Sequence, residues 1–164
     1  MRMTIEAGVE EISGCEEVSV GAMAKRLSRG MLMGARGNSG VILSQLFYGL
    51  SKGLNGLQEA TLEEFANALN EGVKHAYSAV AHPVEGTILT VAREASEYIK
   101  NHITEEKDFS TLLNDFLIEM KESLQRTPNL LPVLKEAGVV DSGGAGLVYI
   151  TEGFYKAING EQLN

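Results

Sequence analysis

Three short glycine-rich loops hold most of the residues in this chain whose types and spacing could do chemistry. The first reads Gly-Ala-Arg-Gly-Asn-Ser-Gly over residues 34–40 and precedes an apolar segment that begins near Val41. Asn38 and Ser39 suit the cap position of a helix, which would leave unpaired N–H groups and the positive end of the helix dipole pointing outward. Such a helix start binds anions, most often phosphate. It is not a Walker A loop, because the Gly-Lys-Ser/Thr ending is absent.

Two further loops have the same character. Residues 83–87 read Pro-Val-Glu-Gly-Thr and lead into a helix at Ile88, and residues 141–146 read Asp-Ser-Gly-Gly-Ala-Gly and lead into a helix at Leu147. Helix starts at one end of a bundle can converge, and the three loops would then aim N–H groups and hydroxyls at one ligand. Alternatively, each loop only caps its own helix and lets backbones approach closely. The residues alone leave both interpretations open.

Other kinds of site find less support. Glu85 and Asp141 could act as acid, base or ribose partner, but lone carboxylates in loops usually cap helices or are solvated. The three histidines lack the spacing of metal ligands. Ser39 and Ser142 have neither a Gly-x-Ser-x-Gly elbow nor an obvious base, which argues against a hydrolase. No metal ligand and no catalytic residue is therefore assigned.

Composition bounds the class of protein. The 164 residues are enough for one domain with a core, and the net charge of −8 argues against nucleic acid or an anionic membrane surface as partner. The single cysteine, Cys15, cannot form an internal disulfide, which fits a reducing cytoplasm, and no basic neighbour in the sequence would activate it. No apolar run is long enough to span a bilayer.

The elements that must position these loops are predicted to be helices. Apolar residues recur with helical spacing, no long stretch alternates with period two, and only three prolines interrupt the chain. Thr61 and Glu64 form a capping box, and Asp108 suits a cap. The sequence therefore predicts an all-α, antiparallel up-and-down fold. The expected helices cover residues 4–13, 19–34, 39–54, 62–80, 88–103, 109–124, 130–137 and 143–158.

The three loops, in this order, resemble those of the DhaL (DAK2) kinase domain, and in particular the version at the N-terminus of fatty acid kinase A proteins. The runs that carry the resemblance are Ala-Arg-Gly-Asn-Ser-Gly-Val-Ile at 35–42, Pro-Val-Glu-Gly-Thr-Ile-Leu-Thr-Val-Ala at 83–92 and Val-Asp-Ser-Gly-Gly-Ala-Gly-Leu at 140–147. The resemblance spans essentially the whole chain, and the combination of motifs is specific.

The resemblance implies an eight-helix antiparallel barrel that binds Mg-ATP at one end. It places the phosphates at the first loop, the nucleotide beside the second, and its ribose and base against the third. The implied nucleotide-binding residues are Asn38, Ser39, Gly40, Thr87, Ile88, Asp141, Ser142 and Gly143. Fatty acid kinases phosphorylate the carboxylate of an acyl chain that a separate fatty-acid-binding protein carries, so the resemblance also implies such a partner.

One departure from the family pattern matters. The family's metal loop, Asp-Gly-Asp-Thr-Gly, belongs just before the helix that begins near Met3, and it does not occur here. The three aspartates, Asp108, Asp115 and Asp141, are not spaced to chelate Mg²⁺ together. We therefore expect residues 1–164 to be a single-domain fragment of a larger kinase, without the family's first helix and metal loop and inactive by itself. Apolar surface exposed by the lost helix would favour self-association, for example as a homodimer.

Two alternatives remain. The chain could belong to a kinase for dihydroxyacetone (glycerone) or a related triose, although the sequences of the first two loops argue against that substrate. It could also be a non-catalytic helical module that has lost its metal loop and binds an apolar or protein partner.

Overall fold

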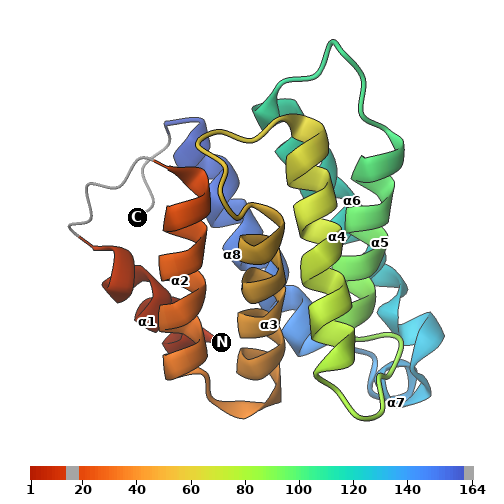
Figure 1. The fold of residues 1–164 in the computed structure, drawn as a ribbon. Coiled ribbons are helices and arrows are strands. Elements are labelled where there is room, and N and C mark those ends of the chain that lie inside the picture. Colours follow the sequence, from red (N-terminus) through yellow and green to blue (C-terminus); the bar gives the residue numbers. More distant parts are fainter. Residues whose placement is uncertain (14–18, 161–164) are drawn as a thin grey trace. The chain divides into compact units, whose positions relative to one another are not determined.

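A computed structural model describes residues 1–13 and 19–160 (Figure 1). These residues form eight α-helices and no strand, which confirms the all-α prediction. Cys15 lies outside the described residues, so its interpretation as an inert thiol stays a prediction. No helix in the described ranges is both long and apolar enough to cross a membrane.

The helices group into two compact units, Met1–Pro83 and Val84–Asn164, which we call the N-terminal unit and the C-terminal unit. Each is described by itself. The N-terminal unit contains α1 (Arg2–Ile12), α2 (Val20–Gly34), α3 (Gly37–Gly53) and α4 (Leu62–Ser78). The C-terminal unit contains α5 (Ile88–Asn101), α6 (Phe109–Leu130), α7 (Pro132–Ala137) and α8 (Ser142–Ile158).

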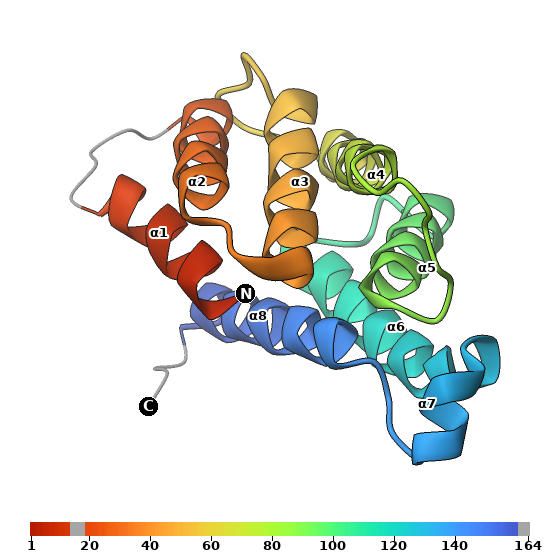
Figure 2. The same cartoon turned by 90° about the horizontal axis from the view of Figure 1, so that it is seen from below.

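In the N-terminal unit each helix packs on the next, so that α2 lies between α1 and α3, and α3 lies between α2 and α4 (Figure 2). The start of α2 is tied to the segment after α3, because the N–H of Gly21 donates to the carbonyl of Leu57 at 3.0 Å. Close packing of α3 on α4 depends on small residues. A Cβ on Gly49 would lie 2.5 Å from the Cα of Gly72.

In the C-terminal unit, α6 contacts α5, α7 and α8 (Figure 1). The apolar faces predicted for α5 and α6 form the core, in which Val91, Leu112 and Met120 are almost completely buried. A polar link joins the same two helices at their edge. The hydroxyl of Ser123 donates to the carboxylate of Glu94 at 2.8 Å, and the guanidinium of Arg126 lies 3.3 Å from the same group.

The end of α6 departs most from the predicted boundaries. We expected α6 to end at residue 124, but it continues past Pro128 to Leu130, and α7 begins at Pro132. Proline has no N–H, so the carbonyl of Leu124, four residues earlier, loses its usual helical donor. The hydroxyl of Thr127 donates to that carbonyl at 2.7 Å instead, and the helix continues.

The two caps read from the sequence are confirmed. Thr61 and Glu64 form both hydrogen bonds of a capping box at the start of α4. At the start of α6, the carboxylate of Asp108 accepts a hydrogen bond from the N–H of Thr111 at 2.7 Å. This bond favours the charged carboxylate and lowers the pKa of Asp108 below its ordinary value of 3.8.

The lowered pKa predicts a specific acid dependence of stability. The contribution of the Asp108 cap is present above the unfolded-state pKa and is lost as the pH falls through the lower folded-state value. Asp108→Asn keeps a capping side chain that does not titrate. We expect the free energy of unfolding, measured by urea denaturation, to fall more steeply with acid in the parent chain than in the variant. Parallel curves for the two chains would contradict this assignment.

Candidate functional site

The first loop forms the start of α3, but its cap differs from the prediction. Asn38 and Ser39 do not occupy the cap position but lie in the first turn of α3. The cap residue is Arg36. Gly37 explains the shift. Its φ of +70° lies in the left-handed region that favours glycine, and the chain turns into the helix there, with nothing within 4 Å of the place where a Cβ would be.

No side chain caps this helix start. The first N–H groups of a helix have no carbonyl partner within it, so the start of α3 presents donors that no cap side chain accepts. Asn38 is exposed and Ser39 is half-buried. The exposed guanidinium of Arg36, which donates to the carbonyl of Ala35 at 2.9 Å, adds a positive charge beside them. This arrangement suits an anion.

The surroundings of Gly40 differ from those of the other residues in the first loop. It is buried, and a Cβ there would lie 2.6 Å from the Oγ1 of Thr4 in α1. The same position would lie 3.9 Å from the backbone nitrogen of Met1, so the starts of α1 and α3 are neighbours (Figure 2). Like α3, α1 has no side-chain cap. Gly40 therefore lets two positive helix ends approach each other.

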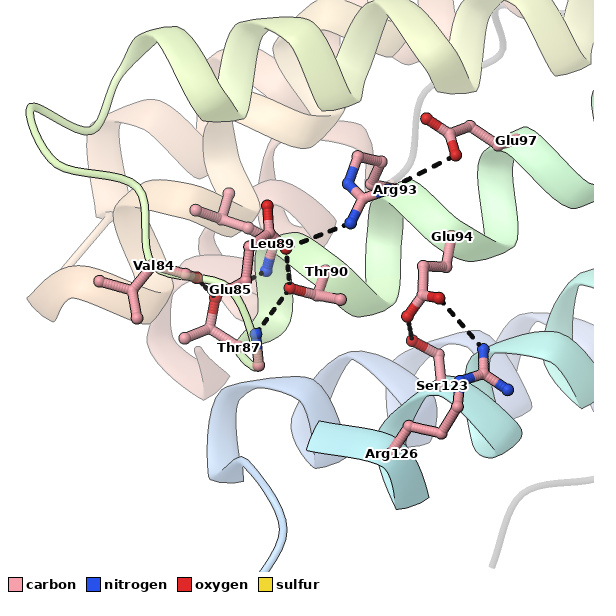
Figure 3. Close-up of polar contacts among 11 residues, drawn as sticks. Val84, Glu85, Thr87, Leu89, Thr90, Arg93, Glu94, Glu97, Ser123 and Arg126 are labelled. Atoms are coloured by element: carbon pink, nitrogen blue, oxygen red, sulfur yellow. Dashed lines mark hydrogen bonds and ion pairs between the residues drawn. The ribbon is translucent and has the colours of Figure 1, made fainter. Parts of the chain in front are cut away.

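The second loop is closed by its own hydrogen bonds (Figure 3). Thr87 caps α5: its hydroxyl accepts from the N–H of Leu89 at 3.3 Å and donates to the carbonyl of Val84 at 2.7 Å. Ile88, which was expected beside a nucleotide, is only 3% exposed and belongs to the core. The side chain of Thr87 is the more accessible of the two.

Glu85 is held in place. Its carboxylate accepts a hydrogen bond from the hydroxyl of Thr90 and lies 3.2 Å from the guanidinium of Arg93 (Figure 3). The hydroxyl of Thr90 in turn accepts from the N–H of Gly86 at 2.8 Å. These contacts give Glu85 a structural role in shaping the loop.

The third loop also caps its helix. The carboxylate of Asp141 accepts from the N–H of Gly144 at 2.8 Å at the start of α8. Ser142 is exposed, whereas Gly143 is buried. Of the three residues predicted here, Ser142 therefore has the side chain that is open to a ligand.

Thr127 of α6 brings the second and third loops together. Its hydroxyl accepts a hydrogen bond from the N–H of Asp141 at 3.2 Å. Its carbonyl oxygen would lie 2.9 Å from a Cβ on Gly86, whose φ of +85° also favours glycine. The starts of α5 and α8 thus meet at one residue. The first loop belongs to the N-terminal unit, so the convergence of all three stays a prediction.

Sequence reasoning missed Thr127 because it expected α6 to stop at residue 124. A signal was present: a threonine directly before Pro128 can supply the donor that the proline lacks. Thr90 lies within the quoted second motif, but nothing in the sequence marked it as the residue that closes the loop around Gly86 and Glu85.

Residues 1–13 and 19–160 contain no cluster of side chains that would form a metal site. No group of three or more histidine, cysteine, aspartate or glutamate side chains is close enough there to hold an ion. Asp108 and Asp141 cap helices, and Asp115 pairs with Lys107 at 2.7 Å.

The comparison with known proteins agrees with the resemblance seen in the motifs. The family model described as DAK2 domain matches residues 1–156. Protein YloV of Bacillus subtilis is 49% identical over 163 residues, which are 99% of this chain and 30% of that protein. Uncharacterized proteins of Staphylococcus epidermidis and Staphylococcus saprophyticus are each 48% identical over 99% and 100% of this chain. The chain spans about 30% of the length of these relatives.

The double role of Thr127 predicts the effect of removing its hydroxyl. Thr127→Val keeps the shape but leaves the buried carbonyl of Leu124 and the N–H of Asp141 without this partner. We expect a loss of about 2 kcal/mol in the free energy of unfolding, mainly from the carbonyl of Leu124, which is the more buried of these two groups. Thr127→Ser, which retains the hydroxyl, should lose less. Equal stability of the valine variant and the parent chain, in urea denaturation, would show that the hydroxyl has no such role.

Proposed function

This chain belongs to the DAK2 domain family, and from that premise we propose that it is the ATP-binding domain of a kinase. The observation that carries the proposal is the uncapped start of α3. At the starts of α5 and α8, the side chains of Thr87 and Asp141 already accept backbone N–H groups. The first turn of α3 keeps its donors for a ligand, and the adjoining start of α1 adds to the positive potential.

The phosphates of the nucleotide would bind at the start of α3. The N–H groups of Gly37 and its neighbours and the side chains of Asn38 and Ser39 are the proposed donors, and Arg36 supplies the nearby positive charge. Each hydrogen bond to a charged oxygen is worth roughly 1.5–3 kcal/mol, so a few of them give appreciable affinity.

The loops of the C-terminal unit would border the ribose and base. Thr87 and Ser142 offer the side chains that are not buried, and Gly143 provides a surface without a side chain. Because Glu85 and Asp141 are bound to their own loops, we assign them to holding these loops in shape rather than to proton transfer.

Magnesium fits the described residues poorly. ATP phosphates bring their own negative charge to a positive helix end, but Mg²⁺ bound with ATP is usually held by one or two carboxylates besides the phosphates and water. The three aspartates of the chain already cap helices or pair with Lys107. The contribution of this chain to phosphoryl transfer would be positioning the nucleotide and stabilising its charge.

For the substrate we propose the carboxylate of an acyl chain carried by a fatty-acid-binding partner protein. The support is the sequence of the first two loops, Gly-Asn-Ser-Gly and Pro-Val-Glu-Gly-Thr, which resembles the loops of fatty acid kinases more than those of triose kinases. Self-association and a cytoplasmic location are part of the same proposal. The relatives are about three times longer than the matched segment, so this substrate belongs to the activity of a whole protein.

Asn38→Asp separates phosphate binding from simple helix capping. A carboxylate in the first turn of α3 interacts favourably with the helix dipole but repels phosphate. We expect a melting temperature equal to or above that of the parent chain, together with an affinity for ATP about tenfold weaker by titration calorimetry. Asn67→Asp, which makes the same chemical change at an exposed position of α4, is the control and should leave the affinity unchanged.

If Asn38→Asp binds ATP as tightly as the parent chain, the start of α3 is not the phosphate site. If the parent chain itself fails to bind ATP, the nucleotide-binding function is wrong for these residues.

The poor fit of magnesium predicts that this chain does not transfer a phosphoryl group by itself. Given ATP, Mg²⁺ and a fatty acid on a carrier protein, the 164 residues should form no acyl phosphate, because no carboxylate cluster in the described ranges would hold the metal at the transferring group. Trapping with hydroxylamine and detection of the hydroxamate would measure this. A hydroxamate whose formation requires the chain would contradict the prediction.

A further inference from the structure

The pair Asn-Gly occurs twice in the chain, as Asn55-Gly56 after α3 and as Asn159-Gly160 after α8. In such a pair, the backbone nitrogen of the second residue can attack the side-chain carbonyl carbon of the asparagine and close a cyclic imide. Glycine favours this step, because it has no Cβ to hinder the approach and its backbone adopts more conformations than that of other residues. The sequence alone therefore gives both sites the same reactive pair.

The reacting groups of Asn159-Gly160 already have hydrogen-bond partners. The side-chain oxygen of Asn159 accepts from the hydroxyl of Ser110 at 2.9 Å, and its side-chain nitrogen donates to the carbonyl of Tyr155 at 2.8 Å. The N–H of Gly160 donates to the carbonyl of Ala157 at 3.1 Å. These bonds fix the amide and occupy the N–H that would have to lose its proton, so they must open before the ring can close.

The same groups of Asn55-Gly56 lack such partners. Neither the side-chain amide of Asn55 nor the N–H of Gly56 forms a hydrogen bond with any residue that the structure describes. Asn55 and Asn159 are both exposed, so access to water does not distinguish the two sites. The difference between them lies in the hydrogen bonds.

We propose that Asn55 is a site of spontaneous deamidation in the folded protein, whereas Asn159 is protected. The backbone nitrogen of Gly56 forms a bond to the side-chain carbonyl carbon of Asn55, and the bond from that carbon to the side-chain nitrogen breaks. The side-chain nitrogen leaves as ammonia, with the proton that Gly56 gives up. Water then adds to either carbonyl carbon of the imide and opens the ring, which leaves aspartate or isoaspartate at position 55.

The loop that contains Asn55 is tied to the start of α2, so the two products should differ in their effect. The N–H of Leu57 donates to the carbonyl of Leu54 at 3.1 Å, and the carbonyl of Leu57 accepts from the N–H of Gly21 at 3.0 Å. The packing is close, because a Cβ on Gly21 would lie 2.5 Å from the carbonyl oxygen of Leu54. Isoaspartate lengthens the main chain between Leu54 and Leu57 and should loosen this contact, whereas aspartate keeps the ordinary backbone.

Incubation of the folded chain at physiological temperature and pH, followed by mass spectrometry of its peptides, tests the proposal. We expect conversion at Asn55 to be about tenfold faster than at Asn159, because several hydrogen bonds must first open at Asn159. In the urea-unfolded chain the two rates should become similar, since both pairs then lack these partners.

Variants separate the causes. Ser110→Ala removes one partner of Asn159 and should speed its conversion, whereas Ser78→Ala, at an exposed position of α4, should leave both rates unchanged. Asn55→Gln should block the reaction at position 55, because its longer side chain closes the ring far less readily. On ageing, the melting temperature of the parent chain should fall and that of Asn55→Gln should not. Freshly prepared Asn55→Asp should melt close to the parent.

Equal rates at Asn55 and Asn159 in the folded chain would show that the hydrogen bonds do not decide which site reacts. Conversion of Asn55 in urea but not in the folded chain would show that the loop protects it, and the proposal would be wrong. An unchanged rate at Asn159 in Ser110→Ala would remove the reason given for its protection. Isoaspartate at position 55 without a fall in melting temperature would contradict the effect on α2.

Discussion

The hydrogen bonds of the Thr127 hydroxyl are the interactions on which the arrangement of the C-terminal unit depends most directly. Pro128 removes a helical donor, and the Thr127 hydroxyl replaces it at the carbonyl of Leu124. Because α6 then continues to Leu130, its last turn reaches the loops that begin α5 and α8. The same hydroxyl accepts from Asp141, and the Thr127 carbonyl lies against Gly86. One residue therefore maintains a long helix and bonds the third loop through its hydroxyl, while its backbone carbonyl lies against the second loop.

The helix starts in the three glycine-rich loops differ in how their backbone donors are used. At α5 and α8 the donors are bonded by Thr87 and Asp141, and Glu85 is fixed by Thr90 and Arg93. The start of α3 has no such side chain. In physical terms the second and third loops are held in shape by their own hydrogen bonds, whereas the first leaves backbone donors that no cap side chain accepts, which suits an anion. This difference is the basis for assigning the phosphates to α3.

Local sequence patterns predicted the helices well, because apolar spacing and caps such as the Thr61 box depend on residues within a few positions of each other. Features that depend on distant partners or on a single dihedral angle were not accessible. The shift of the α3 cap to Arg36 follows from the left-handed φ of Gly37, and the need for glycine at position 40 comes from Thr4 of another helix. The extension of α6 past Pro128 required one hydroxyl to point at one carbonyl.

The central proposal is that residues of all three motifs bind the same nucleotide, and mapping of backbone amide chemical shifts during an ATP titration tests it most directly. The account predicts that the amides of Gly37–Gly40 shift together with those of Thr87 and Ser142–Gly144, with one dissociation constant for both groups. Shifts confined to a single loop, or different dissociation constants for the loops of the two units, would contradict a shared site. An absence of shifts in all three would contradict nucleotide binding itself.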